Sequence, residues 1–237
     1  MEAKGKPTKP KDPLELIIQL MQVKAGMKQD VFARTKDVFG QLKEVLAELA
    51  ERLESAMVEK DPRLHTEYED QGELSAKLKV AGDTIIFHMH TNVFKLDQSH
   101  SLWKTGYLDE DELRGYFGVV NIYNFLSDSF KFDRERDLGY LVARLFLNKD
   151  GHFFLQGKRQ LGFLYNDLPN DVLDRSRLVE VMRSVVLYVL DFDLLAPPYD
   201  QVNQVTVEEM KQLNSNSLLS TGKRLGFRFQ ADSEDPT

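Results

Sequence analysis

Hydrophobic residues recur at helical spacing through the N-terminal quarter of the chain. Asp12-Pro13 predicts a helix start, because an aspartate accepts hydrogen bonds from free N–H groups and a proline at the first turn loses none. Gly26 weakens the helix and marks a bend. A second helical run is expected from about Asp30 to Glu59, ending before a proline, since the residue preceding proline avoids helical geometry. The apolar face of the first run is formed by Leu14, Ile17, Ile18 and Met21.

Within the second run, apolar residues follow alternating steps of three and four, and Thr35 fills the one gap. This spacing is typical of the seam of a coiled coil or helical bundle. Valines widen the stripe in its first half, which suits packing on a domain, whereas the narrower end suits a partner helix. The seam consists of Phe32, Phe39, Leu42, Leu46, Leu49, Leu53 and Ala56, and all but Ala56 form the candidate interaction surface.

Alternating and β-branched segments predict strands in the middle of the chain. Two hairpins are expected around the turn sequences Gly82-Asp83 and Asn148-Lys149-Asp150-Gly151. The strands expected in these hairpins and after them are 73–80, 84–96, 138–147, 152–156, 160–165 and 225–229.

Three further helices are predicted in the second half, and the last is a short one from the capping-box pair Thr206 and Glu209 to about Leu213. The first begins at the acidic run 109–112, because acids complement the positive end of a helix dipole. Apolar residues at helical spacing continue it to about Phe130, and the segment is longer than a typical strand. The second helix is expected from Asp174 or Ser176 to Leu190.

Together these elements predict an α+β fold. We expect an antiparallel sheet of about five strands flanked by helices and preceded by a long amphipathic N-terminal helical segment. This order of elements is similar to that of PAS and GAF sensor modules and of profilin-like and roadblock-like adaptors, with no shared motif. The expected organisation is a disordered basic tail at 1–12, a helical or coiled-coil segment at 13–61, a sheet domain at 62–230 and a disordered tail at 231–237.

Composition narrows the classes of function. With 42% hydrophobic and 29% charged residues, the 237-residue chain can bury a core. A net charge of −7 argues against non-specific nucleic-acid binding, which depends on Lys and Arg neutralising phosphates. No stretch approaches the ~20 apolar residues of a membrane-spanning helix, and the N-terminus lacks the apolar core of a secretory signal. We therefore expect a cytoplasmic protein without a membrane or nucleic-acid partner.

Signatures of catalysis or of cofactor binding are scarce. The chain has no cysteine, which excludes disulfides, thiolate zinc sites and cysteine nucleophiles. Neither a glycine-rich phosphate loop nor a serine-nucleophile elbow occurs. His88 and His90 share one face of a predicted strand, yet two imidazoles supply only half of a metal coordination shell. We expect neither a metal nor a cofactor.

One short segment has a sharper interpretation. Asp137 precedes a predicted hairpin whose second strand ends in Gln156-Gly157-Lys158. This arrangement resembles metal-dependent nucleases of the PD-(D/E)xK kind. The resemblance implies Mg²⁺ held by Asp137 and Gln156, with Lys158 orienting the attacking water. Gln156 stands where such enzymes usually have a carboxylate, the ligand that Mg²⁺ prefers.

The same region contains a basic pair beside glycines. The sequence Gly157-Lys158-Arg159-Gln160-Leu161-Gly162-Phe163 nearly recurs at 222–227, one residue shorter. Lys158 and Arg159, with the single tryptophan Trp103, are the candidate contacts for a ligand or an anion.

Two functions remain open. The first is a non-enzymatic protein-interaction or ligand-sensing module that self-associates, or binds a partner helix, through its N-terminal helix, while the sheet domain binds a peptide or small ligand. The seam and the lack of assembled catalytic groups favour it. The second is a Mg²⁺-dependent nuclease using Asp137, Gln156 and Lys158. The pattern leaves open whether the seam packs within the chain or between chains.

Overall fold

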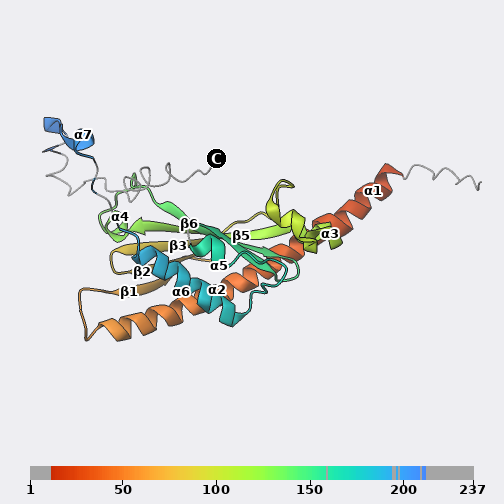
Figure 1. Cartoon of the computed structure of the whole chain (residues 1–237), viewed down its shortest axis with the longest axis horizontal. Coiled ribbons are helices and arrows are strands. Elements are labelled where there is room, and N and C mark those ends of the chain that lie inside the picture. Colours follow the sequence, from red (N-terminus) through yellow and green to blue (C-terminus); the bar gives the residue numbers. More distant parts are fainter. Residues whose placement is uncertain (1–11, 159, 194–195, 197, 209, 212–237) are drawn as a thin grey trace, which may run out of the picture.

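A long N-terminal helical rod lies across an antiparallel sheet (Figure 1). The computed structural model describes residues 12–158, 160–193, 196, 198–208 and 210–211. Asp12 caps the rod as expected, and its Oδ1 accepts a hydrogen bond from the Leu14 N–H at 3.1 Å. Helical geometry continues through Gly26. The rod is made of α1 (Pro13–Leu20), the π-helical turn η1 (Met21–Ala25) and α2 (Gly26–Met57).

The sheet has seven strands, all paired antiparallel. Its order is β1-β2-β3-β5-β6-β7, with β4 paired to β5. The α+β fold with an antiparallel sheet is therefore confirmed, although the sheet exceeds the expected five strands. The strands are β1 (Thr66–Asp70), β2 (Ser75–Val80), β3 (Asp83–Met89), β4 (Phe94–Lys95), β5 (Tyr116–Leu126), β6 (Tyr140–Asn148) and β7 (Phe153–Gly157).

Shorter helices connect and flank the strands. α6 begins where predicted, because the Asp174 carboxylate accepts a hydrogen bond from the Arg177 N–H at 2.7 Å. The helices are η2 (Ser101–Thr105), α3 (Tyr107–Glu110), η3 (Glu112–Gly115), α4 (Ser127–Lys131), α5 (Gln160–Leu164), α6 (Arg175–Leu190) and α7 (Tyr199–Val202).

The main core lies between one face of the sheet and the helices α2 and α6 (Figure 1). Strand β2 shows the pattern that produces it, because Ala76, Leu78 and Val80 are buried while the residues between them are half-buried. The buried positions of α2 are Met27, Val31, Thr35, Phe39, Leu42, Val45, Leu46 and Ala50. They form a stripe too wide for a two-helix seam and suited to a sheet.

Rod and sheet approach each other closely at Gly118 of β5. A Cβ built on Gly118 would lie 2.0 Å from Thr35 Oγ1, so no larger residue fits unless Thr35 or the helix moves. Thr35 is buried, and its hydroxyl donates to the Val31 carbonyl at 2.7 Å within the helix. The polar gap in the apolar stripe therefore faces a strand position that has no side chain.

Two sequence predictions are wrong. Residues 116–126 form strand β5 rather than the start of a helix reaching Phe130. β5 lies inside the sheet between β3 and β6 and is buried on both faces along Tyr116–Val120, so its apolar residues are contiguous and imitate helical spacing.

The expected strand at 160–165 is largely the helix α5. It buries Leu161 beside the end of β7, and an apolar segment this short is compatible with either the helical or the strand period. The expected strand at 225–229 lies outside the described residues.

Candidate functional site

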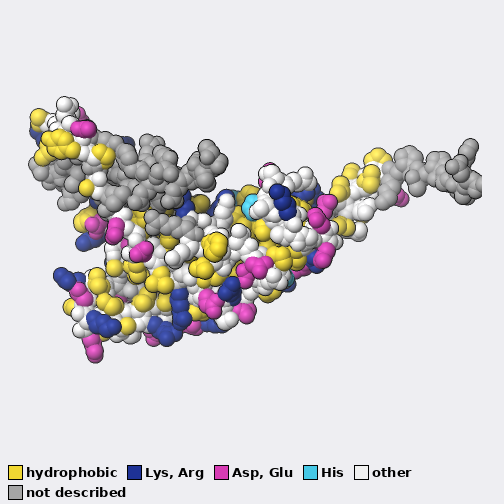
Figure 2. Space-filling view, in the orientation of Figure 1, with side chains coloured by type: hydrophobic (Ala, Val, Ile, Leu, Met, Phe, Trp, Pro, Cys, Tyr) yellow, Lys and Arg dark blue, Asp and Glu magenta, His cyan; other side chains and the backbone are white. Residues whose placement is uncertain are grey.

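The first candidate site is the N-terminal end of the rod, residues 13–25, which we call the arm. No residue of α1 or η1 is buried, and the arm extends past the sheet (Figure 1). Figure 2 shows apolar side chains clustered along it. A helix that is apolar on most sides is normally covered by other protein. The exposed apolar side chains are Leu14, Leu16, Ile17, Ile18, Leu20, Met21 and Val23, each between 42% and 65% exposed.

A shallow groove of about 320 Å³ runs along one side of the arm. Its lining combines apolar side chains with the stems of two lysines, Lys24 and Lys28, whose ammonium groups lie 5.8 and 5.5 Å from the centre of the Tyr116 ring. Glu15 in the first turn gives the opposite end of the arm a negative charge. The arm is therefore an apolar helix with charges of opposite sign at its two ends.

The predicted interaction surface on α2 lies elsewhere. Phe39, Leu42 and Leu46 are buried in the main core of this chain. The remaining seam residues, Phe32, Leu49 and Leu53, are half-buried. The alternative in which the seam packs within the chain therefore holds for its central residues, and the wide first half of the stripe was the signal for it.

A second candidate site lies on the sheet face opposite α2 and α6. It is a pocket of about 350 Å³ whose floor is formed by alternate residues of three neighbouring strands. Residues 90–100, between β3 and η2, supply its wall. The floor residues are Phe117, Val119 and Asn121 of β5, Arg144 and Phe146 of β6, and Phe154 and Gln156 of β7.

The aromatic part of this floor is tightly ordered. The Phe146 and Phe154 rings stack with centroids 4.5 Å apart and planes within 3° of each other. The Phe117 ring stands edge-on to both, at 6.1 and 5.4 Å. Arg144 donates a hydrogen bond to the Gln156 side chain, and its guanidinium carbon lies 5.4 Å from the centre of the Phe146 ring.

The wall of the pocket is tied to the sheet. β4 pairs with β5 through Phe94 and Lys95, and the Leu96 N–H donates to the Gly115 carbonyl at 2.9 Å. A Cβ on Gly115 would lie 2.7 Å from the Trp103 indole, so the ring can pack here only because residue 115 has no side chain. Trp103 packs behind the wall with the Lys95 ammonium 5.7 Å from its ring centre.

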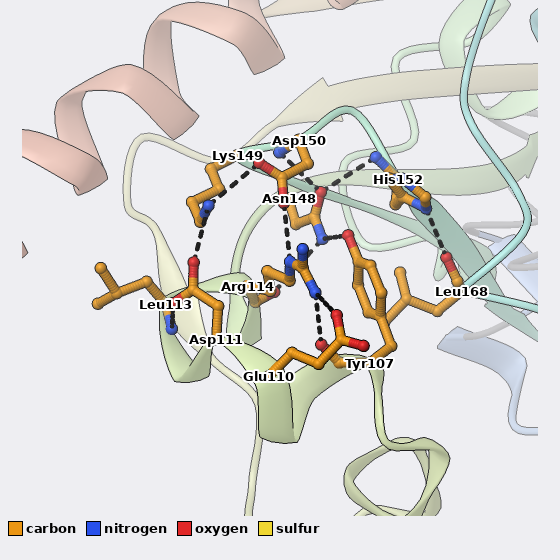
Figure 3. A network of polar contacts seen from close by, with 10 residues as sticks. All are labelled: Tyr107, Glu110, Asp111, Leu113, Arg114, Asn148, Lys149, Asp150, His152 and Leu168. Atoms are coloured by element: carbon orange, nitrogen blue, oxygen red, sulfur yellow. Dashed lines mark hydrogen bonds and ion pairs between the residues drawn. The ribbon is translucent and has the colours of Figure 1, made fainter.

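A polar cluster, which we call the clamp, fastens the chain after the wall to the β6–β7 turn (Figure 3). Fully buried Asn148 accepts hydrogen bonds from the Asp150 and His152 N–H groups at 3.0 Å and donates to the Tyr107 hydroxyl at 3.1 Å. Arg114 bridges Asp150, Glu110 and the Tyr107 carbonyl at 2.7–3.0 Å.

Hydrogen bonds within the clamp shift the pKa values of its acidic and basic groups in the directions that favour their charged forms. The hydrogen bond from Lys149 lowers the pKa of the Asp111 carboxyl, with the two groups 3.0 Å apart. The hydrogen bond to Glu110 raises the pKa of the Arg114 guanidinium, while burial raises the pKa of the Tyr107 phenol. The ion pairs therefore persist at neutral pH and position the wall.

The residues of the nuclease hypothesis have other partners. The Asp137 carboxylate accepts from the Ser129 hydroxyl at 2.6 Å and pairs with Arg134 at 2.8 Å, with its side chain 3% exposed. Gln156 is bonded to Arg144 on the pocket floor. Lys158 is exposed after the end of β7, and Arg159 lies outside the described residues. Within the described part of the chain, no three His, Asp or Glu side chains are arranged to hold a metal ion.

Sequence inspection missed most of the pocket. Of the predicted ligand contacts, Trp103 lies behind the wall and only Gln156 of the nuclease set lines the floor. The sequence feature that could have indicated the floor is the alternation of Phe117, Val119 and Asn121. It is recognisable only when 116–126 is taken as a strand. Residues 90–100 come to the floor through tertiary folding and have no local signal.

None of the helices among the described residues is long and apolar enough to span a membrane. Comparisons with protein-family models, with curated proteins and with solved structures find no match to this chain.

Proposed function

We propose that the chain is a non-enzymatic protein-interaction module that self-associates through the arm, residues 13–25. The supporting observation is that seven large apolar side chains of one helix are exposed beyond the sheet. Contiguous apolar surface of this kind is rare on monomers, because leaving it in water forgoes roughly 25 cal/mol per Å² of burial. The seam itself is used inside the chain, so the arm takes over the interaction role first expected of Phe32 to Leu53.

A second copy of the same chain is the occupant that we propose for the arm. Ile17, Leu20, Met21 and Lys24 line one side of it at steps of three and four residues. In a two-fold symmetric pair the same surface of both copies meets, so if residue i contacts j then j contacts i. Such a pair covers Ile17, Leu20 and Met21, which are 53–65% exposed in the single chain.

Sedimentation velocity of the intact protein over a range of micromolar concentrations tests the proposal. We expect a mass that rises with concentration toward the dimer, and monomer for Leu20→Lys, because a charge in an apolar interface must be desolvated. Leu187→Lys is the matched control, since Leu187 of α6 is 68% exposed against 59% for Leu20. A wild-type protein that stays monomeric, or a Leu20→Lys protein of unchanged mass, overturns the proposal.

For the nuclease alternative, Asp137 contacts Ser129 and Arg134, whereas Gln156 contacts Arg144.

A further inference from the structure

We propose that the pocket on the sheet face opposite α2 and α6 binds a small anion with an apolar body. This inference is independent of self-association, because the pocket and the arm share no lining residue. A volume of about 350 Å³ is at the lower end of the range of small-molecule sites, which are mainly apolar with a few convergent polar groups.

The lining favours a ligand with an apolar body. Phe146 and Phe154 stack on each other, Phe117 stands edge-on to both, and all three rings are at most 8% exposed, so they form a rigid floor. The wall offers apolar surface to a ligand, since Phe94 is 41% exposed. An apolar ligand body gains by displacing water from this surface.

The rim determines the charge of the ligand. Arg144 lines the pocket, and among the described residues no carboxylate forms an ion pair with it. Its guanidinium contacts the Gln156 side chain and the Phe146 ring of the floor. The ammonium of Lys95 lies instead beside the rings of Trp103 and Tyr116, because Lys95 pairs with Tyr116 and shares its side of the sheet. A cation without a counter-charge beside an apolar floor favours a ligand that brings the negative charge.

The two histidines of the wall, His90 and His100, add neutral N–H donors. His90 Nδ1 accepts from the Asn92 N–H at 2.9 Å, and His100 Nδ1 accepts from the Leu102 N–H at 3.3 Å. Because Nδ1 is the acceptor in each ring, Nε2 carries the hydrogen and donates.

The one acid in the lining, Asp97, is turned to its own loop, where it accepts from the Ser99 N–H and hydroxyl at 2.8 and 2.5 Å. The pocket-lining groups that can still form hydrogen bonds to a ligand are therefore mostly donors.

The test uses two fluorescent probes that differ in charge. 1-Anilinonaphthalene-8-sulfonate is an anion, and N-phenyl-1-naphthylamine is its uncharged counterpart with the same ring skeleton. Titrated into the full chain, the anion should bind at one saturable site per chain and about tenfold or more tightly than the neutral probe, since hydrogen bonds to charged groups are the strong ones. Equal affinity for both probes, or absence of saturable binding, overturns the proposal.

Substitutions in the pocket lining test whether the probe binds there. Arg144→Gln should weaken the anionic probe by about tenfold or more and leave the neutral probe unchanged. Lys95→Gln should leave the affinity of both probes unchanged, because the Lys95 ammonium lies beside Trp103 and Tyr116 rather than over the floor. Lys79→Gln is the matched control, because it makes the same charge change on the same sheet face outside the pocket lining.

The arm is the other apolar surface on which a probe could bind. Leu20→Lys should leave the affinity of the anionic probe unchanged. Loss of binding in Leu20→Lys with retention in Arg144→Gln would assign the probe to the arm and overturn the proposal.

Discussion

At the scale of single residues, the structure depends on a few positions where a missing side chain or a single charge determines the packing. Gly118 is one, since its lack of a Cβ lets α2 settle onto β5 above Thr35. Asn148 is another, because its side chain satisfies three neighbouring groups at the β6–β7 turn. Such positions have a large effect on the stability of the fold for their size, because a buried polar group without a hydrogen-bond partner costs folding free energy.

We expect Gly118→Ala to lower the free energy of unfolding by about 1–3 kcal/mol, because the new methyl group overlaps Thr35. Denaturant unfolding measures the change. Gly40→Ala is the control, since no atom lies within 4 Å of its added Cβ, and it should stabilise α2 by about 0.5–1 kcal/mol. If overlap is the cause, the loss shrinks in a Thr35→Ala background; an undiminished loss would point to another cause.

The clamp gives a pH-dependent prediction. Lys149 lowers the pKa of Asp111 below its ordinary 3.8, so the pair stabilises the fold above that pH and loses its effect as pH falls through the lowered value. Wild type should therefore exceed Asp111→Asn in stability by at most about 1 kcal/mol at neutral pH, a difference that disappears in acid. Asparagine keeps the capping oxygen that Asp111 offers to the Leu113 N–H. A difference that is constant from pH 7 to pH 3 would rule the ion pair out.

At the scale of elements, one rod has two uses. The apolar stripe of its C-terminal part, α2, packs against the sheet and α6. Its N-terminal part, the arm, has exposed apolar residues beyond the sheet. The π-helical turn Met21–Ala25 joins the two parts. Turns of this kind often occur at functional positions, because they shift the faces of the helix on either side.

Leu46→Ala distinguishes packing within the chain from packing between chains. Leu46 is 0% exposed, so the variant should lose about 2–5 kcal/mol of unfolding free energy through the cavity it leaves. Its mass in sedimentation should equal that of wild type under native conditions. Leu187→Ala, on an exposed position of α6, should change neither quantity. A Leu46→Ala protein of normal stability but altered mass would show that the seam contacts another chain.

At the scale of the whole molecule, the two surfaces are separate. The arm lies at one end of the rod (Figures 1 and 2), and the pocket, which shares no lining residue with it, lies on the sheet face opposite α2 and α6. Separate surfaces allow self-association and ligand binding to be removed one at a time.

Self-association should make the melting temperature depend on protein concentration, because a bound partner stabilises the folded state by mass action. Leu20→Lys should melt at the dilute wild-type temperature at every concentration, because the arm contributes no buried residue to the core. Differential scanning calorimetry at several concentrations provides the measurement. A variant that melts below dilute wild type would show that the arm supports the fold of the single chain.

The sequence by itself determined the elements whose signals are local. The Asp12 and Asp174 caps, the Gly82-Asp83 hairpin and the turn at 148–151 depend on hydrogen bonds and backbone geometry within a few residues, and each was predicted. The seam on α2 was also found as a pattern, because periodicity records that a face is buried.

Only the tertiary structure decided what that face meets and where the pocket lies. Periodicity carries no information on the partner, so the same stripe predicts a sheet or a second helix equally well. β5 was mistaken for a helix because burial on both faces removes the alternation that marks a strand. The pocket joins residues 90–100 to three strands, an arrangement fixed by long-range packing at Gly115, Gly118 and Asn148.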